Sequence, residues 1–328
     1  MNDIMGSVPA LIVIGAIVIP ALVFLALGLG ERILERLLPR RPRRWLRPWV
    51  WLLVPLLIIG LILVYPLIYT LLLSFLDAGG EKFVGGQNFI WAFSGAMLEI
   101  LGNNVIWILA FPLGTLALAL IVAVVFDRVR YEKLAMTLIV LPTAISFAAG
   151  SIIWRQNYAY RPEDSEQLGL LNALWTLIPG ASPVPWLQTP VVNTFALIFV
   201  AIWSGLGVAA LILSAAVKNV PADMLEAARL DGAGEFRVFF QMTLPSIAPA
   251  VLVVITTEVI FALKVFDIVY VMTNGNYDTE VIANRMYKEM FNFRHFGRAA
   301  AIAVVLLAAI VPVMWFNVGR FRAQEEVR

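Results

Sequence analysis

The 328-residue sequence contains no cysteine and a single histidine, His295. The lack of cysteine excludes disulfide bonds and thiolate metal sites, and one histidine does not supply the pair that a histidine metal site needs. A Gly-rich loop followed by Lys and Ser or Thr is also missing, as is a GxSxG turn, so the sequence has neither a P-loop nor that serine-hydrolase turn. We therefore expect a chain that is not an enzyme and that itself binds no metal or cofactor.

Charge is scarce as well, because Asp, Glu, Lys and Arg make up 14% of the residues and hydrophobic residues make up 61%. Soluble domains carry about 25% charged residues. Polar backbone groups in lipid must be satisfied within their own segment, so long apolar runs are predicted to be helices. Seven runs have about the 20 residues needed to cross a bilayer: 8–29, 49–75, 105–126, 134–154, 191–217, 247–272 and 299–318. The sequence thus predicts an all-α integral membrane protein with about seven transmembrane helices.

The distribution of Lys and Arg predicts the orientation of these helices. Seven arginines lie between Arg32 and Arg47. Positive residues concentrate in cytoplasmic loops, so this segment is assigned to the cytoplasm, which places sixteen of the 24 Lys and Arg residues inside and seven outside. The N-terminus is then outside and the C-terminus is cytoplasmic. The loop 273–298 is the most basic of the outside loops, but three acidic residues accompany its positive charges.

The first apolar run, residues 8–29, is predicted to be an uncleaved anchor. No basic region precedes it, and it is longer than the apolar region of a secretory signal peptide. The arginine-rich linker that follows is also compatible with nucleic-acid binding. Its place next to a helix end instead favours a topology determinant that lies against anionic lipid.

One polar insertion, about residues 218–245, interrupts the apolar pattern on the predicted cytoplasmic side. Pro221 suits the first position of a helix, and PADMLEAARL contains strong helix formers. DGAG supplies glycines that can take positive φ, and a second short helix with Phe236, Phe239 and Phe240 on one side is expected to end at Pro245. The insertion therefore predicts a helix-turn-helix that either exposes apolar side chains to a partner or lies on its own membrane domain.

The spacing in this insertion resembles a family signature, EAA, three residues, G, nine residues, I, one residue, LP. Six of its seven positions are filled by Glu226, Ala227, Ala228, Gly232, Leu244 and Pro245, and Met242 stands at the isoleucine position. The segments VGGQNF, GLLNALW, LKVFDIVYVMTNG and RHFGRAAAIAVVLL add to the likeness. The sequence resembles the permease subunits of ATP-binding cassette (ABC) importers for carbohydrates of the maltose type, over roughly residues 49–320.

The resemblance implies a permease domain at 48–328 with a type I importer core of six helices. Residues 1–47, which hold the extra N-terminal helix and the arginine-rich linker, fall outside that core. Family members often have TGGGP where this chain has TNGNY at 273–277. The outer gate is therefore expected to differ there.

The resemblance also implies partners: a second permease subunit, a cytoplasmic ATPase dimer that carries ATP and Mg²⁺, and an extracellular or periplasmic sugar-binding protein. In such a prokaryotic inner-membrane complex the cytoplasmic hairpin enters a groove of the ATPase. Glu226 would make polar contacts there, Ala227 and Ala228 would permit close approach, and Gly232 would permit the turn, with Asp231, Met242, Leu244 and Pro245 in the same motif. The implied substrate is an α-glucoside or related sugar, with a polyol or glycerol phosphate derivative as the alternative.

Four residues are candidates for the substrate path. Glu258 lies near the middle of the run 247–272, where a charge is costly unless it faces protein or water. It either lines the sugar path, pairs with the partner permease, or is protonated and makes one hydrogen bond between helices. Lys264 and Asp267 are expected to pair at i, i+3, and Trp203 either stacks on a sugar ring or packs against other helices.

Two other classes of protein stay open from the residues alone. A proton-coupled secondary transporter would use Glu258 as its proton site, although the two repeated halves usual in such folds are not visible in the sequence. A membrane sensor or scaffold would use the hairpin to bind a partner without moving a solute.

Overall fold

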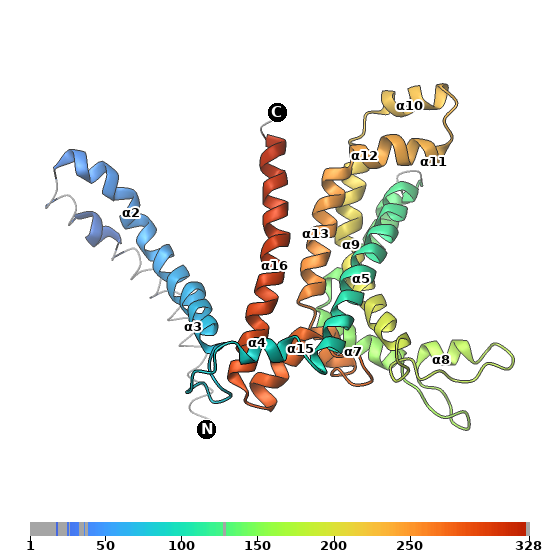
Figure 1. Ribbon diagram of the computed structural model, residues 1–328. Coiled ribbons are helices and arrows are strands. Elements are labelled where there is room, and N and C mark those ends of the chain that lie inside the picture. Colours follow the sequence, from blue (N-terminus) through green and yellow to red (C-terminus); the bar gives the residue numbers. More distant parts are fainter. Residues whose placement is uncertain are drawn as a thin grey trace. The chain divides into compact units, whose positions relative to one another are not determined.

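The computed structural model describes residues 39–126 and 129–325, together with positions 18, 25, 27–32 and 36. Every named element in these ranges is a helix, and the single extended pairing among them is an isolated bridge between Leu76 and Phe83 (Figure 1). The prediction of an all-helical protein is confirmed for the described residues. The predicted first span, residues 8–29, lies almost entirely outside them.

The chain divides into two compact units, Met1–Leu72 and Leu73–Arg328. In the first unit, α2 (Arg40–Ile59) continues through one π-helical turn, η1 (Gly60–Val64), into α3 (Tyr65–Leu73). The stretch Leu46–Leu73 is long and apolar enough to cross a membrane, and nearly all of it is exposed. Such a surface is stable only in an apolar surrounding, which a bilayer provides.

The second unit contains all the other helices that the structure describes after α3. They are α4 (Gln87–Ala92), α5 (Met97–Phe126), α6 (Glu132–Val140), η2 (Leu141–Ala144), α7 (Phe147–Asn157), α8 (Leu170–Trp175), α9 (Val192–Lys218), α10 (Ala222–Leu230), α11 (Glu235–Val238), η3 (Phe239–Thr243), α12 (Leu244–Ser246), α13 (Ala248–Leu263), α14 (Asp267–Met272), α15 (Ile282–Tyr287), η4 (Lys288–Asn292) and α16 (Phe296–Glu325).

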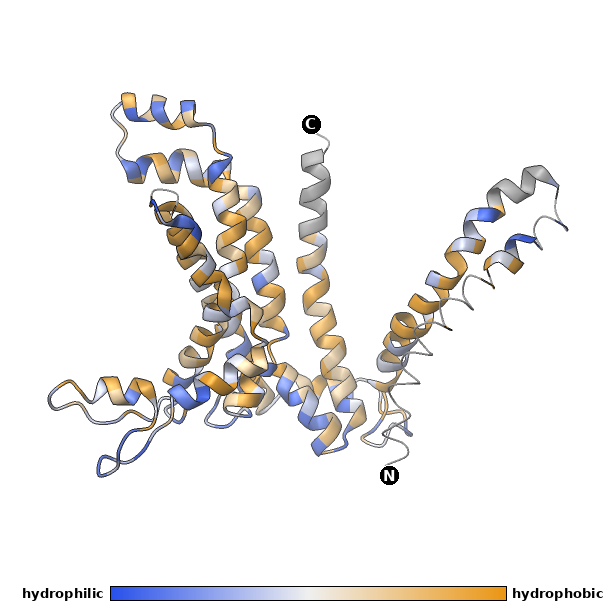
Figure 2. Cartoon of the chain, turned by 180° about the vertical axis from the view of Figure 1, so that it is seen from behind, coloured by the Kyte–Doolittle hydropathy of each residue, from blue (hydrophilic) through white to orange (hydrophobic). Residues whose placement is uncertain are grey.

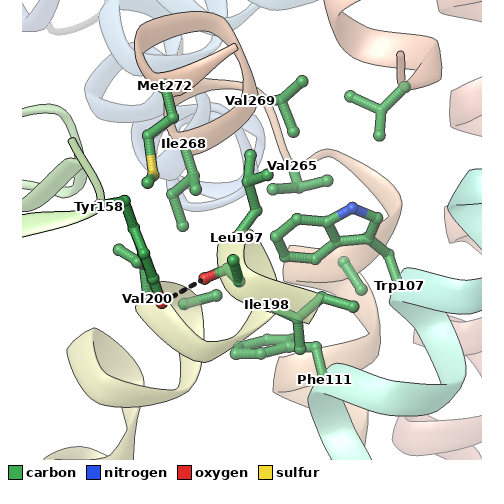
Figure 3. Close-up of a cluster of buried hydrophobic side chains, with 14 residues drawn as sticks. Trp107, Phe111, Tyr158, Leu197, Ile198, Val200, Val265, Ile268, Val269 and Met272 are labelled. Carbon is green, nitrogen blue, oxygen red and sulfur yellow. Dashed lines mark hydrogen bonds between the residues drawn. The ribbon is translucent and has the colours of Figure 1, made fainter. Parts of the chain in front are cut away.

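Helices α5 and α9 form the centre of this unit. Trp107 and Phe111 of α5 are buried with Leu197 of α9 and with Ile268 and Val269 of α14 (Figure 3). Tyr158 follows α7, and its hydroxyl donates a hydrogen bond of 3.3 Å to the backbone carbonyl of Ala196. Side chains of α5 and α14, together with the ring of Tyr158, therefore pack around the first half of α9.

A second buried cluster joins the other half of α9 to α5 and α6, through Ala119, Ala123, Met136, Ala209, Ala210 and Leu213. The small side chains allow the helices to approach closely, as is common in membrane bundles. Gly207 of α9 is the tightest point, because a Cβ atom there would lie 2.7 Å from the Cα atom of Val140. We infer that this position requires glycine.

Four described helical segments are long and apolar enough to span a membrane, and two bent pairs raise the number to as many as six. The four segments are Leu46–Leu73, Met97–Phe126, Val192–Lys218 and Phe296–Phe316. Hydrophobic residues run along them, and hydrophilic residues gather at the ends of the second unit (Figure 2). These segments match the predicted runs 49–75, 105–126, 191–217 and 299–318 closely.

The two other predicted spans are not single straight helices. The run 134–154 bends by 101° between Ala144 and Phe147, where Ser146 caps α7 by accepting a 3.2 Å hydrogen bond from the Ala149 amide. The run 247–272 is interrupted after Leu263, and α14 begins at Asp267. The interruption lets Val265, Ile268 and Val269 all enter the same buried cluster.

Candidate functional site

The predicted hairpin is present as two helical segments after α9. The first is α10, and the second runs through α11, η3 and α12. Pro221 is the residue before α10 rather than its first residue, and Pro245 lies inside α12 rather than ending it. The chain turns instead around Ile247, where the second segment meets α13 at 74°.

The turn between the two segments is built around Gly232, whose φ is +84°. The amides of Asp231 and Ala233 donate 3.0 Å hydrogen bonds to the carbonyls of Ala227 and Ala228, so the last carbonyls of α10 are satisfied. A Cβ atom at position 232 would meet nothing within 4 Å. Glycine is therefore needed here for its backbone conformation and not for space.

An ion pair joins the two segments beside this turn. The Nε atom of Arg229 lies 2.9 Å from Oε1 of Glu235, and both side chains are partly exposed. The hydrogen bond that Arg229 donates to Glu235, and the negative charge of Glu235, raise the pKa of the Arg229 guanidinium. At the base of the hairpin, Lys218 at the end of α9 pairs with Glu132 at the start of α6. The first contact joins the two segments of the hairpin, and the second joins α9, from which the hairpin continues, to α6.

Part of the exposed surface of the hairpin is apolar, although the insertion as a whole is polar. Leu230 and Phe236 are 89% and 84% exposed, and Phe240 is also exposed. Glu226 and Ala227 share the exposed side, whereas Ala228 is buried against the second segment. Of the two alanines that were predicted to permit close approach of a partner, Ala227 is exposed and Ala228 is buried. Asp231, Gly232 and Pro245 are exposed, and Met242 and Leu244 are half-buried.

Glu258 lies on α13 where this helix meets α5 and α9. It is 9% exposed. A Cβ atom added to Gly205 of α9 would lie 3.8 Å from the Oε1 atom of Glu258 and 3.8 Å from the ring of Phe111. The rings of Phe111, Phe261 and Phe147 follow one another nearby, with centroids 5.2 and 4.7 Å apart. No hydrogen bond or ion pair to the Glu258 carboxylate is made by the part of the chain that the structure describes.

The other three residues of the predicted path lie differently. Trp203 is half-buried and packs edge-to-face on Trp154, with ring centroids 5.6 Å apart. Lys264 and Asp267 are both exposed, and they lie on either side of the interruption between α13 and α14. Among the described residues no ion pair joins them, because they do not share one helix as the i, i+3 spacing requires.

The polar side chains that hold the turn 273–280 were not predicted from the sequence. Residues Asn274, Tyr277 and Asp278 all have positive φ, and the turn is held from other helices. The Nδ2 atom of Asn193 on α9 donates 2.6 Å to the Tyr277 carbonyl, and that of Asn103 on α5 donates 2.7 Å to the Asp278 carbonyl. The available signal was the presence of asparagines at the starts of apolar runs.

A buried carboxylate near this turn was also missed. Glu289 of η4 is fully buried, 2.5 Å from an Arg285 nitrogen and 2.8 Å from Nδ1 of His295. The sole histidine of the chain is thus paired with a carboxylate. No group of three or more metal-ligating side chains occurs in the ranges that the structure describes.

An apolar cavity of about 470 Å³ opens between α4, α5, α15 and α16. Its walls are aliphatic and aromatic apart from Asn104, as seen in Phe89, Leu101, Ile108, Ile282 and Leu306. A polyhydroxylated solute needs several hydrogen-bonding groups, which these walls do not offer.

Comparison with known proteins identifies the family. Residues 115–318 match the family described as binding-protein-dependent transport system inner membrane component. The chain belongs to this family, and is therefore a multi-pass permease subunit of an ABC importer in the inner membrane.

Two relatives are similar along most of the chain. The osmoprotective compounds uptake permease protein GgtC of Synechocystis is 52% identical over 257 residues, which is 78% of this chain and 92% of that protein. The α-glucoside transport system permease protein AglF of Rhizobium meliloti is 42% identical over 75% of this chain and 74% of that protein. The structure of a bacterial alginate ABC transporter in complex with an alginate-bound periplasmic protein shares the fold, with a TM-score of 0.70 at 21% identity, covering 84% of this chain and 93% of the compared chain.

Proposed function

We propose that this chain forms, with a second permease subunit, the translocation path of an ATP-driven importer for neutral glucosides. Its hairpin, α10 to α12, would couple that path to a cytoplasmic ATPase dimer. The observation that supports this most is the hairpin itself, a braced polar projection that exposes Leu230, Phe236 and Phe240 at the end of a membrane bundle. Exposed apolar groups on a rigid projection are typical of a surface that inserts into a partner.

Within this hairpin the proposed roles differ by position. Glu226 and Ala227 lie on the exposed side with Leu230 and would meet the ATPase directly. Ala228, Met242 and Leu244 are at least half-buried and would hold the two segments together. Gly232 forms the turn, next to Asp231, and Pro245 lies in the last helical turn before the bend. The ATPase groove would therefore contact α10 and the turn first.

The other components follow from this arrangement. ATP and Mg²⁺ would bind to the ATPase subunits, and a binding protein would deliver substrate on the opposite side of the membrane. The N-terminus would lie outside and the C-terminus in the cytoplasm, with residues 1–47 as an additional anchor outside the permease domain 48–328. Closure of the ATPase dimer would move the hairpins, and the membrane helices would switch the side to which the path is open.

Two observations favour a neutral glucoside as substrate. The relatives at 52% and 42% identity are named for osmoprotective compounds and for α-glucosides, and an osmoprotective α-glucoside satisfies both names. Glu258 is the acidic group of the proposed path and has no cationic partner among the described residues. A carboxylate accepts hydrogen bonds from sugar hydroxyls and disfavours an anion such as glycerol phosphate. Trp203, which packs on Trp154, would act on packing, and the exposed Lys264 and Asp267 would lie at the rim of the path.

The turn residue Gly232 tests the coupling role. Alanine at a φ of +84° costs about 1–2 kcal/mol, which shifts the hairpin about five- to thirtyfold toward other conformations. We predict that Gly232→Ala lowers uptake per ATP hydrolysed in the reconstituted complex. Gly234→Ala is the matched control, because Gly234 has a φ of −69° and equally free space.

Equal uptake per ATP in Gly232→Ala, Gly234→Ala and the unaltered complex would contradict the coupling role. Co-purification of the ATPase with each variant shows separately whether the complex still assembles. A loss of assembly in both glycine variants would point to a general requirement of the hairpin for binding and not to the conformation of Gly232.

A further inference from the structure

Helix α8 on the outer side has an inverted distribution of polarity. Leu170 and Leu174 of α8 (Leu170–Trp175) are one helical turn apart, Ile178 follows in the turn after the helix, and all three side chains are more than half exposed. Asn172, on the opposite side, is fully buried. A short helix on the surface of a soluble protein would bury its leucines and expose its asparagine. The medium that faces α8 is therefore expected to be apolar.

This exposure is not a consequence of a loosely held helix. The Asn172 amide group donates to the carbonyls of Ala159 and Val184 at 3.2 and 3.0 Å. Its Oδ1 atom accepts from the Val184 amide and the Trp186 indole at 2.9 and 3.1 Å. At Gly169, a Cβ atom would lie 2.3 Å from the Ala159 carbonyl oxygen. These contacts fix α8 with its leucines pointing outward.

The surrounding sequence is also that of a segment in lipid. No Asp, Glu, Lys, Arg or His occurs between Gln167 and Val217. Trp175 packs edge-to-face on Trp186, with centroids 6.0 Å apart, and is partly exposed, as tryptophans at a membrane interface commonly are. Val191 and Phe195, at the start of the span α9, are exposed apolar residues as well.

The placement of α8 separates a lipid from a docked protein. In Figure 1, α8 lies at the end of the second unit opposite α10, runs across the direction of α9 and α13, and extends sideways from the bundle. Figure 2 shows hydrophobic residues along it and a hydrophilic loop beside it. That loop carries Glu163, Asp164 and Glu166, which are exposed. A helix that lies across the direction of the spans is parallel to a membrane surface, whereas a binding protein would approach from beyond the helix ends.

We propose that α8 and the turn after it form a membrane-surface anchor, in which Leu170, Leu174 and Ile178 enter the outer leaflet while the acidic loop 163–166 stays in water. The occupant is the acyl-chain and headgroup boundary of the bilayer. The acidic loop disfavours anionic headgroups, so the contact depends on apolar burial and not on charge. The anchor would hold the outer end of the α7 to α9 connection at a fixed depth during transport.

Single-cysteine labelling tests this anchor directly, because the chain has no cysteine of its own. Leu174→Cys and Ile178→Cys would be spin-labelled in the complete complex in phosphatidylcholine nanodiscs. The accessibility of each label to oxygen and to a water-soluble nickel chelate would then be measured. Asp164→Cys, ten residues before Leu174 and on the acidic loop, is the control. We expect positions 174 and 178 to be accessible to oxygen and protected from nickel by at least about fivefold relative to position 164.

Two outcomes would overturn the proposal. Labels at 174 and 178 that are as accessible to nickel as the label at 164 would show that α8 faces water. Labels that become protected only when the substrate-binding protein is added would show that α8 docks a protein. Neither outcome affects the coupling role of the hairpin, which is measured separately.

Discussion

Glu258 is the residue through which we propose that this chain contacts its substrate. Its carboxylate lies between α5, α9 and α13 and has no partner among the described residues of this chain. One of the three interpretations of the sequence was a hydrogen bond from Glu258 to another helix of this chain. The structure gives no support to that interpretation. Contact with substrate and contact with the second permease are the two roles that we propose for it.

We predict that Glu258→Gln weakens transport of a neutral glucoside. A hydrogen bond to a charged group contributes about 1.5–3 kcal/mol, so the half-saturating concentration for ATP-driven uptake should rise about ten- to hundredfold. Thr257→Val is the control, because Thr257 is the exposed neighbour and bonds only within its own helix. An unchanged half-saturating concentration in Glu258→Gln would remove Glu258 from the path.

At the scale of elements, the turn 273–280 depends on asparagines from other helices. Asn193 is fully buried and donates to the Tyr277 carbonyl. Loss of a buried hydrogen bond that leaves its partner unsatisfied costs about 1–3 kcal/mol. We predict that Asn193→Ala increases amide hydrogen exchange in residues 274–280 by about five- to a hundredfold.

Asn219→Ala provides the comparison for that experiment. The Asn219 side chain is exposed and donates to the Ala215 carbonyl of its own helix. Exchange in residues 274–280 should be unaffected by this change. If Asn193→Ala also leaves exchange in the turn unaffected, the turn is held by other contacts and the role assigned to Asn193 is wrong.

The elements also show which features the sequence could predict. The hairpin was predictable because its helix formers, glycines and prolines act within a few residues of one another. The interruption after Leu263 was not predictable, because Lys264 is the one charged residue there and the apolar residues Val265 and Phe266 follow it directly. The break follows from burial of Val265 and Ile268 in one cluster, which depends on helices distant in sequence.

At the scale of the whole molecule, long apolar runs predicted the membrane class, and the fixed spacing from Glu226 to Pro245 predicted the family. Both signals are local, so a single sequence carries them. The pairing of Glu289 with Arg285 and His295, and the four hydrogen bonds of Asn172, arise from tertiary contacts. Such contacts left no pattern in the sequence that distinguishes these residues from other polar residues in loops.

The central claim is that this permease moves its substrate with energy from a separate ATPase, and reconstituted transport tests it most directly. The tagged chain would be extracted gently from its native membrane, its partners identified, and the preparation placed in proteoliposomes with the substrate-binding protein. We predict that a second permease and an ATPase co-purify, and that uptake of a labelled α-glucoside requires ATP. A chain that purifies alone and takes up the sugar with a pH gradient in the absence of ATP would contradict the account.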